Sequence, residues 1–248
     1  PKPIELITYF LGFGLTDNEI VMDFFSGSAT TAEAVMRNNI GGNHNRFILI
    51  QLPELIDSTK KATSENSKKV VLNAISVLDE LKKPHYITEL AKERIRRAGK
   101  KIKEESPLTT QDLDTGFRVL KLDSTNMQDI YYSPKDISQA DLFSQVDNVK
   151  PDRTGEDLLF QVMLELGATL DSKIETTTVA GKTIYNVAEG YLGACFDPDA
   201  TDEVVKAIAQ MQPAYVVLRD TSMKDDSTAT NFEQIFKTYS PNTVTKIL

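Results

Sequence analysis

Apolar residues near the start of the chain change from a helical to a strand-like spacing and back again. Residues 4–14 place apolar side chains at helical intervals, whereas 20–25 and 47–52 are near-continuous apolar runs of the length of buried parallel strands. Thr30 and Thr31 can cap a helix between these runs. The pattern therefore predicts a helix, a strand, a glycine loop, a helix and a second strand, in that order.

Two longer helices and one strand are predicted next. Residues 68–81 and 87–105 keep a helical apolar spacing, and Pro84 separates them because proline disfavours helical geometry in the residue before it. Residues 117–122 alternate like a strand. The stretch 123–150 is polar and weakly periodic, which indicates a linker or a long loop.

After residue 150 the pattern becomes that of a small α/β domain, with a hairpin turn at Ala180-Gly181. The predicted segments are helix 158–166, strands 174–179, 182–187 and 192–196, helix 201–211, strand 215–218, helix 229–239 and strand 244–248. The fold class is therefore α/β. We expect one domain over residues 1–122, a linker over 123–150 and a second, smaller α/β domain over 151–248.

Composition limits the class of protein. Of 248 residues, 40% are hydrophobic and 26% are charged, which is ordinary for a globular chain. The single cysteine cannot form an internal disulfide, and no apolar run approaches the ~18 residues of a membrane span, so we expect a soluble, cytoplasmic protein with no membrane contact. The net charge of -8 argues against a free-standing nucleic-acid binder, because phosphate contacts require a basic surface.

Three further features are interpreted structurally. The basic cluster at 92–103 is read as a solvated helix face, since charge runs on helices usually face water. His44 and His85 lack the spacing of metal ligands, so no metal site is predicted. Cys195 lies in an apolar segment, where we expect a buried side chain rather than a nucleophile.

The candidate chemistry lies in the turn after the first predicted strand. Residues 23–31 read Asp-Phe-Phe-Ser-Gly-Ser-Ala-Thr-Thr, so small residues stand where the backbone can approach a ligand and helix-terminal amides can meet an anion. Gln51 ends the next strand, where a polar side chain meets a ribose hydroxyl in doubly wound nucleotide folds. Taken alone, one glycine loop fits a structural tight turn equally well.

Residues 1–7, 23–31 and 45–54 together resemble the cofactor region of amino-methylating DNA methyltransferases. In that family a Lys-Pro helix precedes a Phe-x-Gly-x-Gly loop, and the following strand ends in an acidic or amide residue. The resemblance implies a Rossmann-like S-adenosylmethionine-dependent methyltransferase sheet, present here in part. It also implies S-adenosyl-L-methionine as the cofactor, with its methionine moiety beside Lys2 and Pro3 and its ribose at Gln51.

The implied cofactor-binding residues are Lys2, Pro3, Asp23, Phe24, Phe25, Ser26, Gly27, Ser28, Ala29, Thr30 and Gln51. Ala29 replaces the family's second loop glycine, so its methyl group is expected where the backbone approaches the ligand.

Further similarity, over residues 91–98, 116–124 and 219–226, is to the modification subunits of type III restriction-modification systems, of which the chain would be a carboxy-terminal part. The resemblance implies transfer of a methyl group to the N6 amine of adenine in a specific duplex site. The implied partners are duplex DNA, bound through the full-length protein, a restriction subunit and a second modification subunit.

The family's catalytic Asp-Pro-Pro-Tyr-type segment is absent from this sequence; Asp197-Pro198-Asp199 is the nearest string and does not match. In the resembled class that segment lies amino-terminal to the cofactor loop, and the chain begins with Pro1. We therefore expect the sequence to start inside a longer gene product, to contain no catalytic residue and to be inactive alone.

Two alternatives stay open. A nicotinamide-dependent dehydrogenase has the same fold, although residues 27–32 depart from Gly-x-Gly-x-x-Gly at two glycine positions. A non-catalytic assembly module would contact a restriction or second modification subunit, through exposed apolar residues near Met211, Met223 and Phe236.

Overall fold

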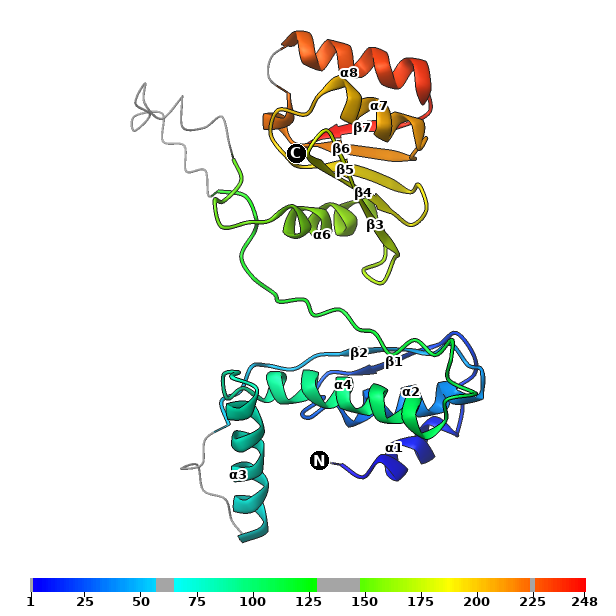
Figure 1. Cartoon of the computed structure of the whole chain (residues 1–248), viewed down its shortest axis with the longest axis vertical. Helices are drawn as coiled ribbons and strands as arrows, with labels where there is room; N and C mark the ends of the chain where they lie inside the picture. Colours follow the sequence, from blue (N-terminus) through cyan, green and yellow to red (C-terminus); the bar gives the residue numbers. More distant parts are fainter. Residues whose placement is uncertain (1, 57–64, 129–147, 224–225) are drawn as a thin grey trace. The chain divides into compact units, whose positions relative to one another are not determined.

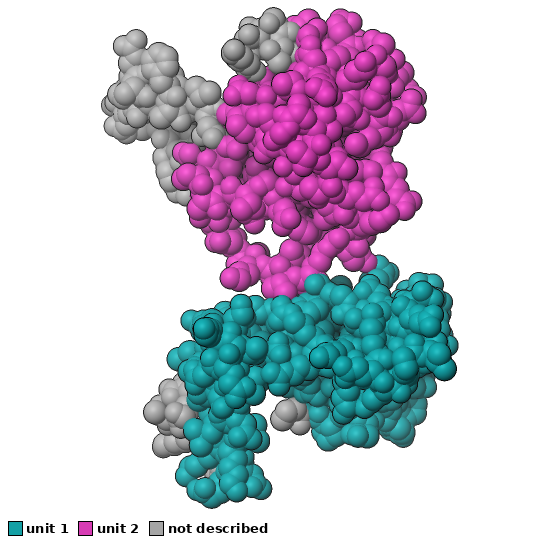
Figure 2. Space-filling view, in the orientation of Figure 1, with its two compact units in different colours: residues 1–117 teal, residues 118–248 magenta. Residues whose placement is uncertain are grey.

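The computed structural model describes residues 2–56, 65–128, 148–223 and 226–248. The chain divides into two compact units, residues 1–117 and residues 118–248 (Figure 2). Both units combine helices and strands, which confirms the α/β class. The predicted linker lies partly outside the described residues, and its described ends pair through a Met127–Val149 bridge in the second unit. The domain limits expected from the sequence stay a prediction.

The first unit contains a two-stranded parallel sheet and its connecting helix (Figure 1). The strands β1 (Ile20–Asp23) and β2 (Arg46–Leu49) pair with Ile20 opposite Arg46, and both are shorter than the predicted runs. Helix α2 (Thr30–Asn38) joins them and ends in a short 3-10 turn, η1 (Asn39–Gly41). The order strand, glycine loop, helix and strand is therefore confirmed.

Helix α4 (Ile87–Glu105) packs against α2 and has the bounds that its apolar spacing predicts (Figure 1). The buried side chains that share this core are Ala29, Ala32, Met36, Ala91, Ile95, Ala98 and Ile102. Those of α4 recur at intervals of three or four residues and so form one stripe of the helix. Phe47 and Leu49 of β2 pack against the same core, which fixes one face of the sheet against the helices.

The other face of this sheet is exposed, which corrects the prediction of two fully buried strands. Ile20, Met22, Ile48 and Ile50 expose between 41% and 54% of their surface. Side chains of a strand alternate between its two faces, so one apolar run supplies both a covered face and a bare face. A continuous apolar run is typical of a strand that is buried on both faces of its sheet. In the described part of the chain, however, other residues cover only one face of the β1–β2 sheet.

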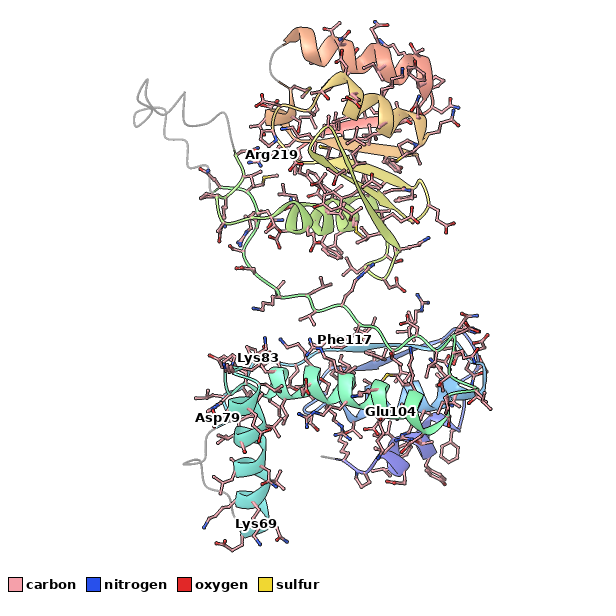
Figure 3. The ribbon with its side chains drawn as sticks, viewed as in Figure 1. Lys69, Asp79, Lys83, Glu104, Phe117 and Arg219 are labelled. Carbon is pink, nitrogen blue, oxygen red and sulfur yellow. The ribbon has the colours of Figure 1, made fainter. Side chains whose placement is uncertain are left out.

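Two more helices complete the first unit. Helix α1 (Ile4–Leu11) packs against α2 but buries no residue fully and leaves Tyr9 and Phe10 exposed. Helix α3 (Glu65–Glu80) contacts α4 through one end, as Figure 3 shows from the positions of Lys69 and Asp79. Among the described segments, no helix has the combined length and apolar character needed to cross a membrane.

The strand predicted over residues 117–122 is wrong, because the structure has no regular element there. Phe117 instead lies against α4, where the Arg96 guanidinium carbon is 5.5 Å from the centre of its ring (Figure 3). Arg118 belongs to the second unit and donates a hydrogen bond to the backbone oxygen of Leu170. The alternating pattern therefore reflects side chains that contact different neighbours rather than a strand in a sheet.

The second unit is a five-stranded mixed sheet in the order β3-β4-β5-β6-β7. Its strands are β3 (Ile174–Val179), β4 (Lys182–Val187), β5 (Leu192–Cys195), β6 (Tyr215–Leu218) and β7 (Val244–Ile247). The first three are antiparallel neighbours, whereas β5, β6 and β7 run parallel. These bounds agree closely with the sequence prediction.

The hairpin between β3 and β4 turns at Ala180 and Gly181, which have φ of 48° and 76°. Two successive positive φ values are typical of the type I′ turn, whose twist matches that of the paired strands.

Helices cover both faces of this sheet (Figure 1). Helix α6 (Gly155–Leu166) packs on one face, in a core with Leu192, and α7 (Asp202–Gln210) and α8 (Asp226–Tyr239) pack on the other, around Ile208. The second unit therefore has a covered core on both sides of its sheet, unlike the first.

Helix α6 begins with a capping box. The Thr154 hydroxyl accepts a hydrogen bond from the Asp157 backbone N–H at 3.3 Å, and the Asp157 carboxylate accepts one from the Thr154 N–H at 2.8 Å. The Thr154 backbone N–H, and after it the Thr154 hydroxyl, which donates to the same carboxylate at 2.7 Å, lower the pKa of Asp157. A carboxylate with a lowered pKa stabilises the fold above its unfolded pKa, and this contribution is lost as the pH falls through its folded pKa.

We expect Thr154→Ala to lower the free energy of unfolding by about 1 kcal/mol, because it removes the cap of α6. Thr201 is a matched control, since it occupies the same position before α7 but makes no capping hydrogen bond with its side chain. Urea unfolding at neutral pH would measure both variants. Equal losses in the two would contradict the capping role of Thr154, and the Thr154 loss should shrink in acid as Asp157 becomes protonated.

Candidate functional site

The loop after β1 is fixed by the carboxylate of Asp23, the last residue of that strand. One oxygen of Asp23 accepts a hydrogen bond from the Phe25 N–H at 3.2 Å, and the other accepts one from the Thr31 hydroxyl at 2.6 Å. The Asp23 backbone oxygen also accepts from the Ile50 N–H at 2.9 Å. Asp23 thus ties the end of β1 to the first turn of α2 and to the chain beyond β2.

A second bond closes the loop from the side of the neighbouring strand. The Gln51 side-chain oxygen accepts a hydrogen bond from the Gly27 N–H at 2.8 Å, and its amide nitrogen donates to the Leu52 backbone oxygen at 3.1 Å. Gln51 and the glycine loop are therefore brought together. The contact with a ribose stays a prediction, because the described contacts of Gln51 are to the loop and to its own strand end.

Gly27 has φ of +53°, in the left-handed region that favours glycine. A Cβ built at this position would meet no atom within 4 Å, so the loop faces open space there. A bulkier residue at position 27 would therefore project into that space rather than clash with the backbone. This geometry leaves room for a ligand beside the exposed surface of the loop.

Ala29 adopts the conformation for which the resembled family has glycine. Its φ is +62° and its ψ is 38°, and it is the residue that precedes α2. Its side chain is fully buried in the core between α2 and α4. The methyl group therefore lies in the core and not, as the sequence suggested, on the path of an approaching ligand. The left-handed φ of Ala29 is strained for a residue with a side chain.

The threonines after Ala29 do not cap α2, which corrects the sequence prediction. Ala29 occupies the cap position and makes no side-chain capping bond. The Thr31 hydroxyl donates to Asp23, and the Thr30 hydroxyl accepts from a side chain of α4. Both hydroxyls therefore connect the loop to its surroundings. The sequence does not separate this role from capping, because both roles use a threonine at the start of a helix.

The side chain on α4 is Arg94. One of its terminal nitrogens donates to the hydroxyls of Ser28, at 3.0 Å, and Thr30, at 2.8 Å. Its other terminal nitrogen is 3.3 Å from a Glu33 oxygen. The Arg94 side chain is 22% exposed and that of Glu33 is 11% exposed, so the group is largely withdrawn from solvent.

Four other cations of the basic cluster agree with the solvated interpretation. Arg96, Arg97, Lys100 and Lys101 are more than half exposed, and each pairs with a glutamate of the same helix at a spacing of three or four residues. Lys92 pairs with Glu89 and is only 20% exposed. Arg94 differs because it lies between Ala91 and Ala98 on the buried stripe of α4. That position in the apolar period is the signal that would have singled it out in the sequence.

The remaining predicted residues lie around the loop. Lys2 and Pro3 are exposed before α1, and Pro3 occupies the N-cap position of that helix without a side-chain capping bond. Phe24 and Phe25 are 59% and 80% exposed, with their rings edge to face and centres 5.7 Å apart. Ser26 is buried, and its N–H lies 3.4 Å from the Ile50 oxygen. Contact of these residues with a cofactor stays a prediction.

Other candidate groups are placed in structural roles. His44 contacts Asp17 and His85 contacts Asp79 on the surface. Cys195 is fully buried, and burial raises the pKa of its thiol. The Asp197 carboxylate accepts a hydrogen bond from the Thr183 N–H at 2.6 Å. Within the described part of the chain, no three His, Cys, Asp or Glu side chains are grouped to hold a metal ion.

Comparison with known proteins gives relatives of one kind, although no family model matches the chain. The type III restriction-modification enzyme EcoP15I Mod subunit of Escherichia coli is 30% identical over 213 residues, covering 84% of this chain and 28% of the relative. The StyLTI Mod subunit of Salmonella typhimurium is 33% identical over 119 residues, which are 48% of this chain and 15% of the relative.

A third relative, the EcoPI Mod subunit of Escherichia phage P1, is 46% identical over 65 residues, or 26% of this chain and 10% of the relative. The chain therefore spans between 10% and 28% of the lengths of these relatives.

Proposed function

Because the chain belongs to the Mod subunits of type III restriction-modification enzymes, as one part of such a subunit, we propose that its first unit binds S-adenosyl-L-methionine for a DNA methyltransferase. The observation that carries this proposal is the loop at 23–31 between β1 and α2, which is bonded to Gln51 beyond the neighbouring strand and to Arg94 of α4 and leaves open space beside Gly27.

The reaction proposed for the whole protein is transfer of the cofactor methyl group to the N6 amine of an adenine in a specific duplex site. The adenine is flipped out of the stack so that its amine meets the cofactor methyl along the line of attack. This chain holds the cofactor part of that site. It lacks an Asp-Pro-Pro-Tyr-type segment, and Asp197 bonds Thr183 in the second unit. The chain alone is therefore expected to transfer no methyl group.

The bare face of the β1–β2 sheet supports this partial role. Parallel sheets are normally covered on both faces, whereas here Ile20, Met22, Ile48 and Ile50 are exposed on one. We propose that further parts of the methyltransferase cover this face in the whole subunit, as helices cover both faces of a Rossmann-like sheet.

Calorimetric titration of this chain with S-adenosyl-L-methionine tests the cofactor proposal. We expect weak binding, and we expect Gly27→Val to abolish it because the new side chain enters the open space of the loop. The matched control is Gly181→Val, since Gly181 also has a positive φ and no atom within 4 Å of a built Cβ, but lies in the other unit. Binding should survive in this control.

The same preparation separates the alternatives. Binding of a nicotinamide dinucleotide in place of S-adenosyl-L-methionine would favour the dehydrogenase. Undiminished binding by a folded Gly27→Val variant would reject the proposed site. Labelled methyl in duplex DNA above background would show that the chain does contain the catalytic machinery.

The second unit is proposed to serve assembly with a restriction subunit or a second modification subunit. It has its own covered core, and acidic residues outnumber basic ones in residues 151–248, which disfavours a phosphate-binding surface. Of the residues around which a contact surface was expected, Phe236 is only 4% exposed and is not available to a partner. Met211 and Met223 are partly buried against the same core, and a partner contact near them stays a prediction.

A further inference from the structure

We draw no further inference here: the strongest candidate, the exposed aromatic patch that Tyr9, Phe10 and Phe13 form on and just after helix α1, carries nothing, because no described part of the chain shows what covers it.

Discussion

Valine in place of Ala29 is expected to lower the free energy of unfolding by about 3 kcal/mol. Ala29 already bears the cost of its φ of +62°, about 1–2 kcal/mol, and a β-branched valine is strained further there. Its side chain is fully buried between α2 and α4, so two extra methyl groups would overpack that core at a cost of about 1–3 kcal/mol. Urea unfolding followed by circular dichroism would measure the change.

The control is Ala29→Gly, which restores the glycine of the resembled family. Relief of the left-handed strain is offset by loss of a buried methyl group, about 0.8 kcal/mol, and by the greater freedom of glycine in the unfolded chain, about 0.4–1 kcal/mol. We expect a net change within about 1 kcal/mol. A large destabilisation by glycine would show that Ala29 contributes mainly through packing, and a small effect of valine would show that the loop adapts.

Gly193→Val is expected to cost about 3 kcal/mol in the second unit, at the upper end of overpacking effects. Gly193 is buried in β5, between β4 and β6, and α7 crosses it closely. A Cβ at this position would lie 2.8 Å from Cγ2 of Ile208 and 3.3 Å from Cγ of Pro213. The helix or the strand would have to move to accommodate valine.

A double-mutant cycle identifies the contact responsible. Gly193→Ala should destabilise the chain when Ile208 is present but should be nearly neutral in an Ile208→Ala background, because the cavity left by Ile208 accommodates the added methyl group. Unfolding free energies of the four proteins measure the coupling. Additive effects would show that Pro213 or the backbone, rather than Ile208, excludes a side chain at position 193.

The sequence predicted those elements whose bounds depend on residues close together in the chain. The bounds of α4 follow from a regular apolar stripe between Pro84 and a polar end, and the hairpin follows from Ala180-Gly181 between alternating segments. The strand predicted over 117–122 failed because alternation also arises where successive residues contact separate neighbours, as Phe117 does with Arg96. A strand requires a partner, which a single segment does not specify.

The candidate site shows the same limit. The glycine loop and Gln51 were predicted because both lie beside strand ends in one βαβ pattern, whose geometry is common to doubly wound folds. Arg94 was not predicted, because its contact with Ser28 depends on how α4 packs against α2. Such packing is set by Ala91, Ala98 and the other small residues between the helices, and it is not visible in the charge run to which Arg94 belongs.

The uneven covering of the β1–β2 sheet also bears on how this segment tolerates mutation. A polar residue at Phe47 or Leu49 would disrupt the core with α2 and α4 in any context. A polar residue at Met22 or Ile48 would barely disturb this chain, since those side chains already meet solvent. If the face is covered in the whole subunit, selection would keep it apolar even though the isolated chain does not need it. Polar substitutions at Met22 and Ile48 would then be tolerated in the isolated chain but not in the whole subunit, whereas those at Phe47 and Leu49 would be tolerated in neither.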